Sequence, residues 1–164
     1  MEENYVEWLV KRKDPIYALP VKIVMAAVFA LSVLMALGSV LGVVLMTVVG
    51  AAGYFIFLSL SVEFEYLFAE GGLRIDRILG RARRKNVFEC EKEEVQIIAP
   101  LGAGQLREYE NQRIKIMDCT SGRTKEGVYA VICQKGSETI KILLEPNEKM
   151  LGAMRRSLPS RFIR

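Results

Sequence analysis

The chain carries no charged side chain between Lys22 and Glu63, and this uncharged stretch limits what the chain can fold into. One helix that crosses a bilayer needs about 20 apolar residues, because each residue adds ~1.5 Å along a hydrocarbon path of ~30 Å. The stretch is about twice that long, and a single helix of this length would exceed the bilayer by roughly 30 Å, which tilting does not absorb. The sequence therefore predicts two spanning helices joined by a tight turn.

Glycine and serine interrupt the run of Val, Leu, Met and Ala residues near its middle. These residues are typical of turns, so we place the turn at Gly38-Ser39, with Gly42 as the alternative corner. The predicted helices cover residues 20–37 and 40–60, within a transmembrane hairpin of residues 20–61. We do not expect a buried hairpin, since 164 residues offer too little other mass to cover it.

Basic residues flank the uncharged stretch on both sides, whereas the turn between the two helices has none. Lysine and arginine accumulate on the cytoplasmic side of membrane proteins. We therefore predict a multi-pass protein of the cell membrane with both termini in the cytoplasm. The flanking cations are Lys11, Arg12, Lys13 and Lys22 before the stretch, and Arg74, Arg77, Arg81, Arg83, Arg84 and Lys85 after it.

Residues 1–19 form a leader for which two interpretations stay open. Tyr5, Trp8 and Leu9 have the spacing of one apolar helix face, and three cations at residues 11–13 follow them. One interpretation is an amphipathic helix in the membrane interface, anchored by Trp8 and by these cations. In the other, Tyr5 and Trp8 pack on the protein's own cytoplasmic domain.

Residues 62–164 suffice for one small cytoplasmic domain, and alternating apolar and polar residues predict that it is mainly β. A helix over residues 147–158 follows, because Asn147 is a good N-cap and apolar residues then recur on one helical face. We expect six or seven short antiparallel strands in a bent sheet or split barrel, closed by this C-terminal helix. The predicted strands cover residues 62–68, 73–79, 85–89, 95–99, 114–117, 128–133 and 139–144, and residues 100–105 form a loop.

Several of these segments resemble known bacterial proteins. The strand at residues 62–68, the hairpins over residues 71–85 and the closing helix are similar to bacterial pleckstrin-homology (PH) domains that follow a pair of membrane helices. Residues 5–13 (YVEWLVKRK) and 145–151 (EPNEKML) resemble an uncharacterised family of small two-span membrane proteins from Gram-positive bacteria. This second resemblance covers nearly the whole chain. It implies the architecture given above and no established activity.

The composition argues against an enzyme. The chain has no histidine, which is the commonest general base and a frequent metal ligand. Its three cysteines, Cys90, Cys119 and Cys133, lack the spacing of a zinc site, and we expect buried or half-buried thiols. The predicted spans place no ionisable residue at the membrane midplane, which argues against transport. We therefore predict a non-catalytic protein without metal or cofactor.

One basic cluster stands out in the predicted cytoplasmic domain, at the turn that follows Gly80. Each cation near an anionic membrane contributes ~1 kcal/mol, so one hypothesis is contact with anionic lipid headgroups. The simpler hypothesis is that the cluster only sets the membrane topology. Nucleic acid is not an expected partner, because acidic residues follow at 89–94 and no aromatic residues interleave the cations. The cluster consists of Arg77, Arg81, Arg83, Arg84 and Lys85.

The hypothesis that we rank first is a membrane-proximal scaffold that binds protein partners. A PH-like domain offers strand edges and a groove beside its helix, and both accept extended peptides. The hairpin would then concentrate this domain at the membrane. The sequence leaves the partner and the oligomeric state open.

Overall fold

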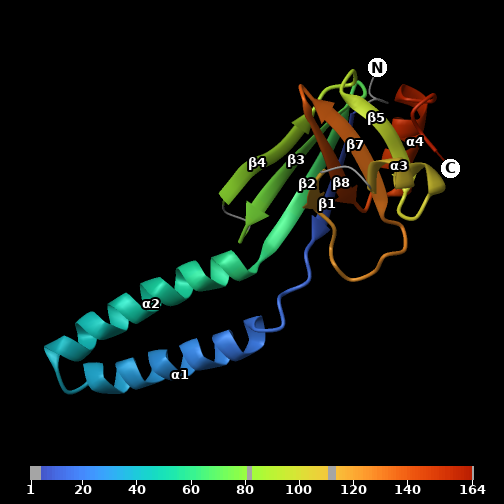
Figure 1. Ribbon diagram of the computed structural model, residues 1–164. Coiled ribbons are helices and arrows are strands. Elements are labelled where there is room, and N and C mark those ends of the chain that lie inside the picture. Colours follow the sequence, from blue (N-terminus) through green and yellow to red (C-terminus); the bar gives the residue numbers. More distant parts are fainter. Residues whose placement is uncertain (1–4, 81–82, 111–113, 164) are drawn as a thin grey trace. The chain divides into compact units, whose positions relative to one another are not determined.

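The computed structural model describes residues 5–80, 83–110 and 114–163, and the chain forms two compact units (Figure 1). The chain leaves one unit after Lys13 and returns to it at Glu63, so that unit is discontinuous in sequence. The β unit consists of Met1–Lys13, Glu63–Ile78 and Arg84–Arg164, and the helical unit consists of Asp14–Val62 and Leu79–Arg83.

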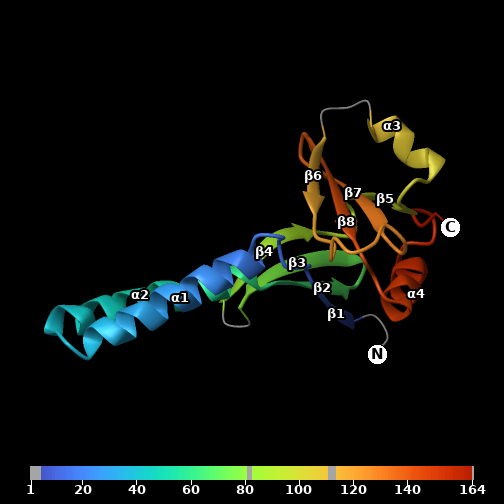
Figure 2. The ribbon, with the colours of Figure 1, turned by 90° about the horizontal axis from the view of Figure 1, so that it is seen from below.

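The helical unit contains α1 (Ala18–Ala36) and α2 (Val40–Leu60), which run side by side in opposite directions (Figures 1 and 2). Both helices are long and apolar enough to cross a membrane. Only 11% of each apolar window is buried. A core helix of a soluble protein would bury most such side chains instead. The predicted hairpin of two apolar helices is confirmed.

The turn between the helices lies where the sequence predicts it. Ser39 is the N-cap of α2, and its hydroxyl accepts a hydrogen bond from the Gly42 N–H at 3.1 Å. The N–H groups of Gly38 and Ser39 both donate to the Met35 carbonyl at 3.2 Å. Gly42 is therefore not the corner. It is the position of closest approach, because a Cβ there would lie 2.3 Å from the Met35 carbonyl carbon.

The β unit contains two four-stranded sheets. Strands β6 and β8 pair in parallel, which is an exception to the predicted antiparallel arrangement. Sheet A has the order β1 (Tyr5–Lys11), β2 (Val62–Ala69), β3 (Gly72–Leu79), β4 (Arg83–Cys90). Sheet B has the order β5 (Val95–Pro100), β7 (Tyr129–Lys135), β8 (Glu138–Leu144), β6 (Lys115–Asp118).

The prediction of an amphipathic helix in the leader is wrong, because residues 5–11 form strand β1. It pairs with β2 along its length, from Tyr5 opposite Ala69 to Lys11 opposite Glu63. Val6 and Val10 share one face of the strand and are buried, whereas Trp8 between them on that face is 38% exposed. The leader thus packs on the β unit, in agreement with the second interpretation.

Helices cover parts of sheet B and of the edge at β1. Strand β5 leads into η1 (Gly104–Leu106) and α3 (Arg107–Glu110), whereas the sequence predicts a loop over residues 100–105 and no helix after it. Leu106 of this segment packs against Ala99 and Ile132 of sheet B. The helix α4 (Glu148–Ser157) begins at the predicted N-cap, since the Asn147 side chain accepts from the Met150 N–H at 2.8 Å. Its buried face lies beside β1 (Figure 2).

We expect Gly42→Ala to destabilise the hairpin, because the new methyl group collides with the backbone of α1. Overpacking of this kind costs about 1–3 kcal/mol. Unfolding of the full chain in mild detergent, followed by helical circular dichroism, measures the change. Gly38→Ala is the matched control, since its Cβ would lie 4.0 Å from the Met35 carbonyl oxygen, which is an ordinary contact distance. Equal stability of the two variants would contradict the close approach at Gly42.

Candidate functional site

The leader cations and several cations of the basic cluster lie at one end of sheet A. Strand β1 ends at Lys11 and β2 begins at Val62, so the chain passes to and from the helical unit at this end. Successive strands of an antiparallel sheet alternate in direction. The end of β3, with Arg77, and the start of β4, with Arg83, therefore lie at the same end as the leader cations.

The turn between β3 and β4 is held against the end of α2, within the helical unit. The Gly80 N–H donates to the Ser61 carbonyl at 2.8 Å. Gly80 has a φ of +56°, and a Cβ there would lie 2.2 Å from Leu58 Cδ2. Only glycine meets both conditions, since it tolerates positive φ and leaves space for Leu58. Gly80, at the start of this turn, is thereby fixed to the residues that end α2.

The structure divides the basic cluster into two kinds of residue. Arg77, Arg83 and Lys85 are exposed, and no ion pair involves them in the described part of the chain. Arg84 instead forms an ion pair with Glu65 of β2, at 2.8 Å from Oε2, and donates to Oε1 at 2.9 Å. Arg81 lies outside the described residues.

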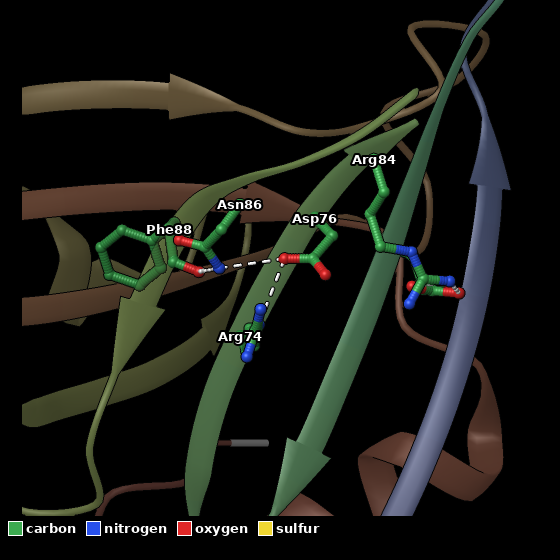
Figure 3. A network of polar contacts seen from close by, with 6 residues as sticks. Arg74, Asp76, Arg84, Asn86 and Phe88 are labelled. Atoms are coloured by element: carbon green, nitrogen blue, oxygen red, sulfur yellow. Dashed lines mark hydrogen bonds and ion pairs between the residues drawn. The ribbon is translucent and has the colours of Figure 1, made fainter. Parts of the chain in front are cut away.

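Arg84 belongs to a polar network on one face of sheet A (Figure 3). In that network Asp76 of β3 is 2% exposed, and its Oδ1 accepts from Arg74 at 3.2 Å and from Asn86 at 2.9 Å. Glu65 is 3% exposed. Buried carboxylates of this kind need charged or hydrogen-bonding partners. The network therefore ties β4 to β2 and β3, and it holds the strand that carries the basic cluster in place.

The buried carboxyl group of Glu65 prefers its protonated form more than an exposed one does. Burial raises the pKa of Glu65, and a hydrogen bond with the Glu7 side chain raises it further. The Arg84 guanidinium acts in the opposite direction and lowers this pKa. Sequence reasoning missed the buried role of Glu65, because a glutamate that alternates with aromatic residues in a strand normally faces water.

The leader cations and Trp8 are placed by β1 and by the segment that follows it. The Arg12 guanidinium lies over the Phe64 ring, 6.0 Å from its centroid. The Lys13 N–H donates to the Ser121 carbonyl at 2.8 Å. Lys11 is exposed at the end of β1. The role of these residues as an interfacial anchor stays a prediction.

Glu145 connects several segments of the β unit. Its carbonyl accepts from the Trp8 indole N–H at 3.1 Å, and its Oε1 accepts from the Ser121 hydroxyl at 2.9 Å. Its N–H donates to the Tyr66 hydroxyl at 3.4 Å, and that hydroxyl donates to the Cys119 carbonyl at 2.6 Å. The two sequence segments that carry the family resemblance, residues 5–13 and 145–151, thus contact each other through Trp8 and Glu145.

The cysteines are buried, as predicted. Burial raises the pKa of Cys119 to about 11. A hydrogen bond with Cys90 and burial together raise the pKa of Cys133 far above its ordinary value. Thiols with raised pKa values are poor nucleophiles. Among the described residues, no group of three or more Cys, Asp or Glu side chains is arranged to hold a metal ion.

The β unit, with its two sheets and its C-terminal helix, is a PH-like domain. The hairpin of two apolar helices is inserted between the first two strands of this domain. A family model described as "Bacterial PH-like domain (DUF6106)" matches residues 2–164. The chain therefore belongs to this bacterial PH-like domain family. No curated protein and no solved structure matches it. The restriction to Gram-positive bacteria stays a prediction.

We expect Arg84→Met to destabilise the β unit by about 1–3 kcal/mol at pH 7.5, because it leaves Glu65 buried without its cation. The loss of folding stability should be smaller at pH 5 than at pH 7.5. Without Arg84 the folded-state pKa of Glu65 rises further above its unfolded value, so the variant loses stability as pH rises through that folded-state pKa. Denaturant titration of the full chain, followed by the fluorescence of its single tryptophan, measures both values.

Lys85→Met is the control for this experiment, since it removes a cation from the same strand that has no ion pair in the described residues. A loss that is equal at both pH values, or equal to that of the control, would contradict the structural role of the Arg84–Glu65 pair.

Proposed function

We propose that α1 and α2 anchor this protein in the bacterial cell membrane, with both chain ends in the cytoplasm, and that its PH-like domain contacts anionic lipid headgroups through the basic cluster. The length, apolar surface and lack of charge of the two helices support the anchor. The cations on both flanks and the uncharged turn between the helices support the orientation. No catalytic step is part of this proposal.

One observation carries the lipid proposal: the turn that bears the basic cluster is bound directly to the end of α2. The hydrogen bond from Gly80 to Ser61 and the close contact between Gly80 and Leu58 fix this position. If α2 crosses the bilayer, the turn is held at the depth of the headgroups. Binding there needs little affinity of its own, because the anchor keeps the local concentration of headgroups high.

The exposed cations of the cluster supply the attraction. Arg77, Arg83 and Lys85 present their charges to solvent, and each contributes ~1 kcal/mol near an anionic surface. Arg84 has a different role, because its guanidinium is engaged with Glu65. We infer that Arg84 positions the strand while its neighbours contact lipid.

Hydrogen exchange of the full chain in nanodiscs tests this proposal. We expect residues 76–86 to exchange more slowly when phosphatidylglycerol is mixed into a phosphatidylcholine bilayer, and we expect high salt to reverse the effect. Arg83→Ala/Lys85→Ala should weaken this protection, since each cation accounts for about a fivefold change in headgroup affinity. The full chain is required because β1 is part of the PH-like domain.

Arg107→Ala/Lys149→Ala is the control, since it removes two exposed cations that lie on α3 and α4. Equal exchange of residues 76–86 in the two bilayers would contradict lipid contact and leave the cluster as a determinant of membrane topology.

A protein scaffold is the second candidate function, and the open edge of sheet A favours it. Strand β4 is the last strand of that sheet, and most of its side chains are exposed. Such an edge accepts an extended peptide as an additional strand. The helices would then serve to concentrate the docking edge at the membrane.

We expect a photo-crosslinking residue in place of the half-buried Val87, in the middle of β4, to give a discrete adduct in cells. The same residue at the exposed Lys149 of α4 is the control. Gel mobility and mass spectrometry of the full chain identify the adduct. Identical crosslinking from both positions would contradict a specific partner on the edge of β4.

A further inference from the structure

The loop between β6 and β7, residues 119–128, borders a cavity of about 350 Å³ in the β unit. Leu101, Val128 and Leu143 form the apolar part of the cavity wall. Thr120, Thr124, Arg123 and Lys125 line it as well, together with Asp118. The cavity thus combines an apolar wall with two cations and two hydroxyl groups. The loop supplies the cations and the hydroxyl groups, and Leu101 and Leu143 come from outside it.

The first half of this loop is fixed by hydrogen bonds to two carboxylates. Asp118 Oδ1 accepts from the Thr120 N–H at 3.0 Å and from its hydroxyl at 2.7 Å. Glu145 Oε1 accepts from the Ser121 N–H at 3.2 Å and from its hydroxyl at 2.9 Å. Thr120 and Ser121 are buried. The base of the loop is therefore held in place before any ligand arrives, which lowers the cost of binding.

The second half of the loop presents two exposed cations, Arg123 and Lys125. Neither forms an ion pair within the residues that the structure describes. The Asp118 carboxylate of the cavity is already engaged by Thr120. The lining therefore carries two cations against one anion, and its net charge favours an anionic ligand.

A neighbouring cavity shows that this charge balance is specific to one side of the loop. It has about 470 Å³ and lies between the loop and β1, with Trp8 in its wall. Its lining holds Lys11 and Arg123, which borders both cavities, together with the carboxylates of Glu126 and Glu145. That cavity is neutral, so it does not select for an anion.

From this arrangement we infer a binding site for a phosphate group in the 350 Å³ cavity, with Arg123 and Lys125 as its cationic ligands and the Thr124 hydroxyl as a donor. Arginine binds phosphate by paired hydrogen bonds and lysine binds it as a point charge. The apolar wall of Leu101 and Val128 suits a ligand that carries a carbon moiety next to its phosphate. The site is separate from the basic cluster and does not depend on the lipid proposal.

The position of the loop leaves two sources for the phosphate. The Ser121 carbonyl accepts from the N–H of Lys13, the last residue of the β unit before the chain passes toward α1. A lipid headgroup and a soluble phosphate ester both supply the required chemistry there. The two sources differ in whether the ligand arrives with the bilayer or from solution.

Methyl NMR of the full chain in nanodiscs tests the site, with the signals of Thr124 and Val128 as reporters of the cavity. In one arm, glycerol 3-phosphate is added to the chain in phosphatidylcholine, with glycerol as the control without phosphate. In the other arm, phosphatidylglycerol replaces part of the phosphatidylcholine. Saturable shifts in the first arm assign a soluble phosphate ester, and shifts in the second arm alone assign a lipid headgroup.

The variant Arg123→Ala/Lys125→Ala should weaken the shifts in the responding arm by about 30-fold in apparent affinity, at ~1 kcal/mol for each cation. Arg123→Lys should retain part of the binding, because it keeps the charge. Arg107→Ala/Lys149→Ala, which removes two exposed cations on α3 and α4 that do not line the cavity, should leave these shifts unchanged. No shift in either arm, or unchanged shifts in Arg123→Ala/Lys125→Ala, would overturn the assignment.

Discussion

Strand β1 pairs with β2 along its full length, although the whole helical hairpin lies between them in the sequence. Closing such a long segment costs entropy, but this cost grows only slowly with length. The antiparallel packing of α1 and α2 reduces it further, because the hairpin returns the chain to the side from which it left. This pairing completes sheet A, and it places both connections to the hairpin at one end of that sheet. The β unit therefore depends on it.

The charges of this protein fall into two groups that differ in function. Buried carboxylates on one face of sheet A engage Arg74 and Arg84, and that arrangement holds the central strands and β4 together. Other cations, such as Arg83 and Lys85, remain exposed near the connections to the hairpin. A uniform basic run in the sequence thus divides into residues that stabilise the sheet and residues that are free to bind an anion.

Glu145 has a comparable role on the other side of the unit. Its backbone contacts Trp8 and Tyr66, and its side chain holds Ser121 in the β6–β7 loop. The same residue therefore joins β1, β2 and that loop. Residues 5–13 and 145–151 thus each supply one half of a contact within the β unit.

The sequence by itself determined the features that depend on local composition. An uncharged stretch of that length specified two helices, Gly38-Ser39 specified their turn, and Asn147 specified the start of α4. Most strands were predicted within a few residues, because alternation of apolar and polar side chains is a local signal. The tertiary structure decided what depends on distant partners. It made the leader a strand because β2 offered an unpaired edge, and it buried Glu65 because Arg84 lies beside it. It also brought Leu101 and Leu143 from separate segments beside the loop that carries Arg123 and Lys125, which no spacing in the sequence encodes.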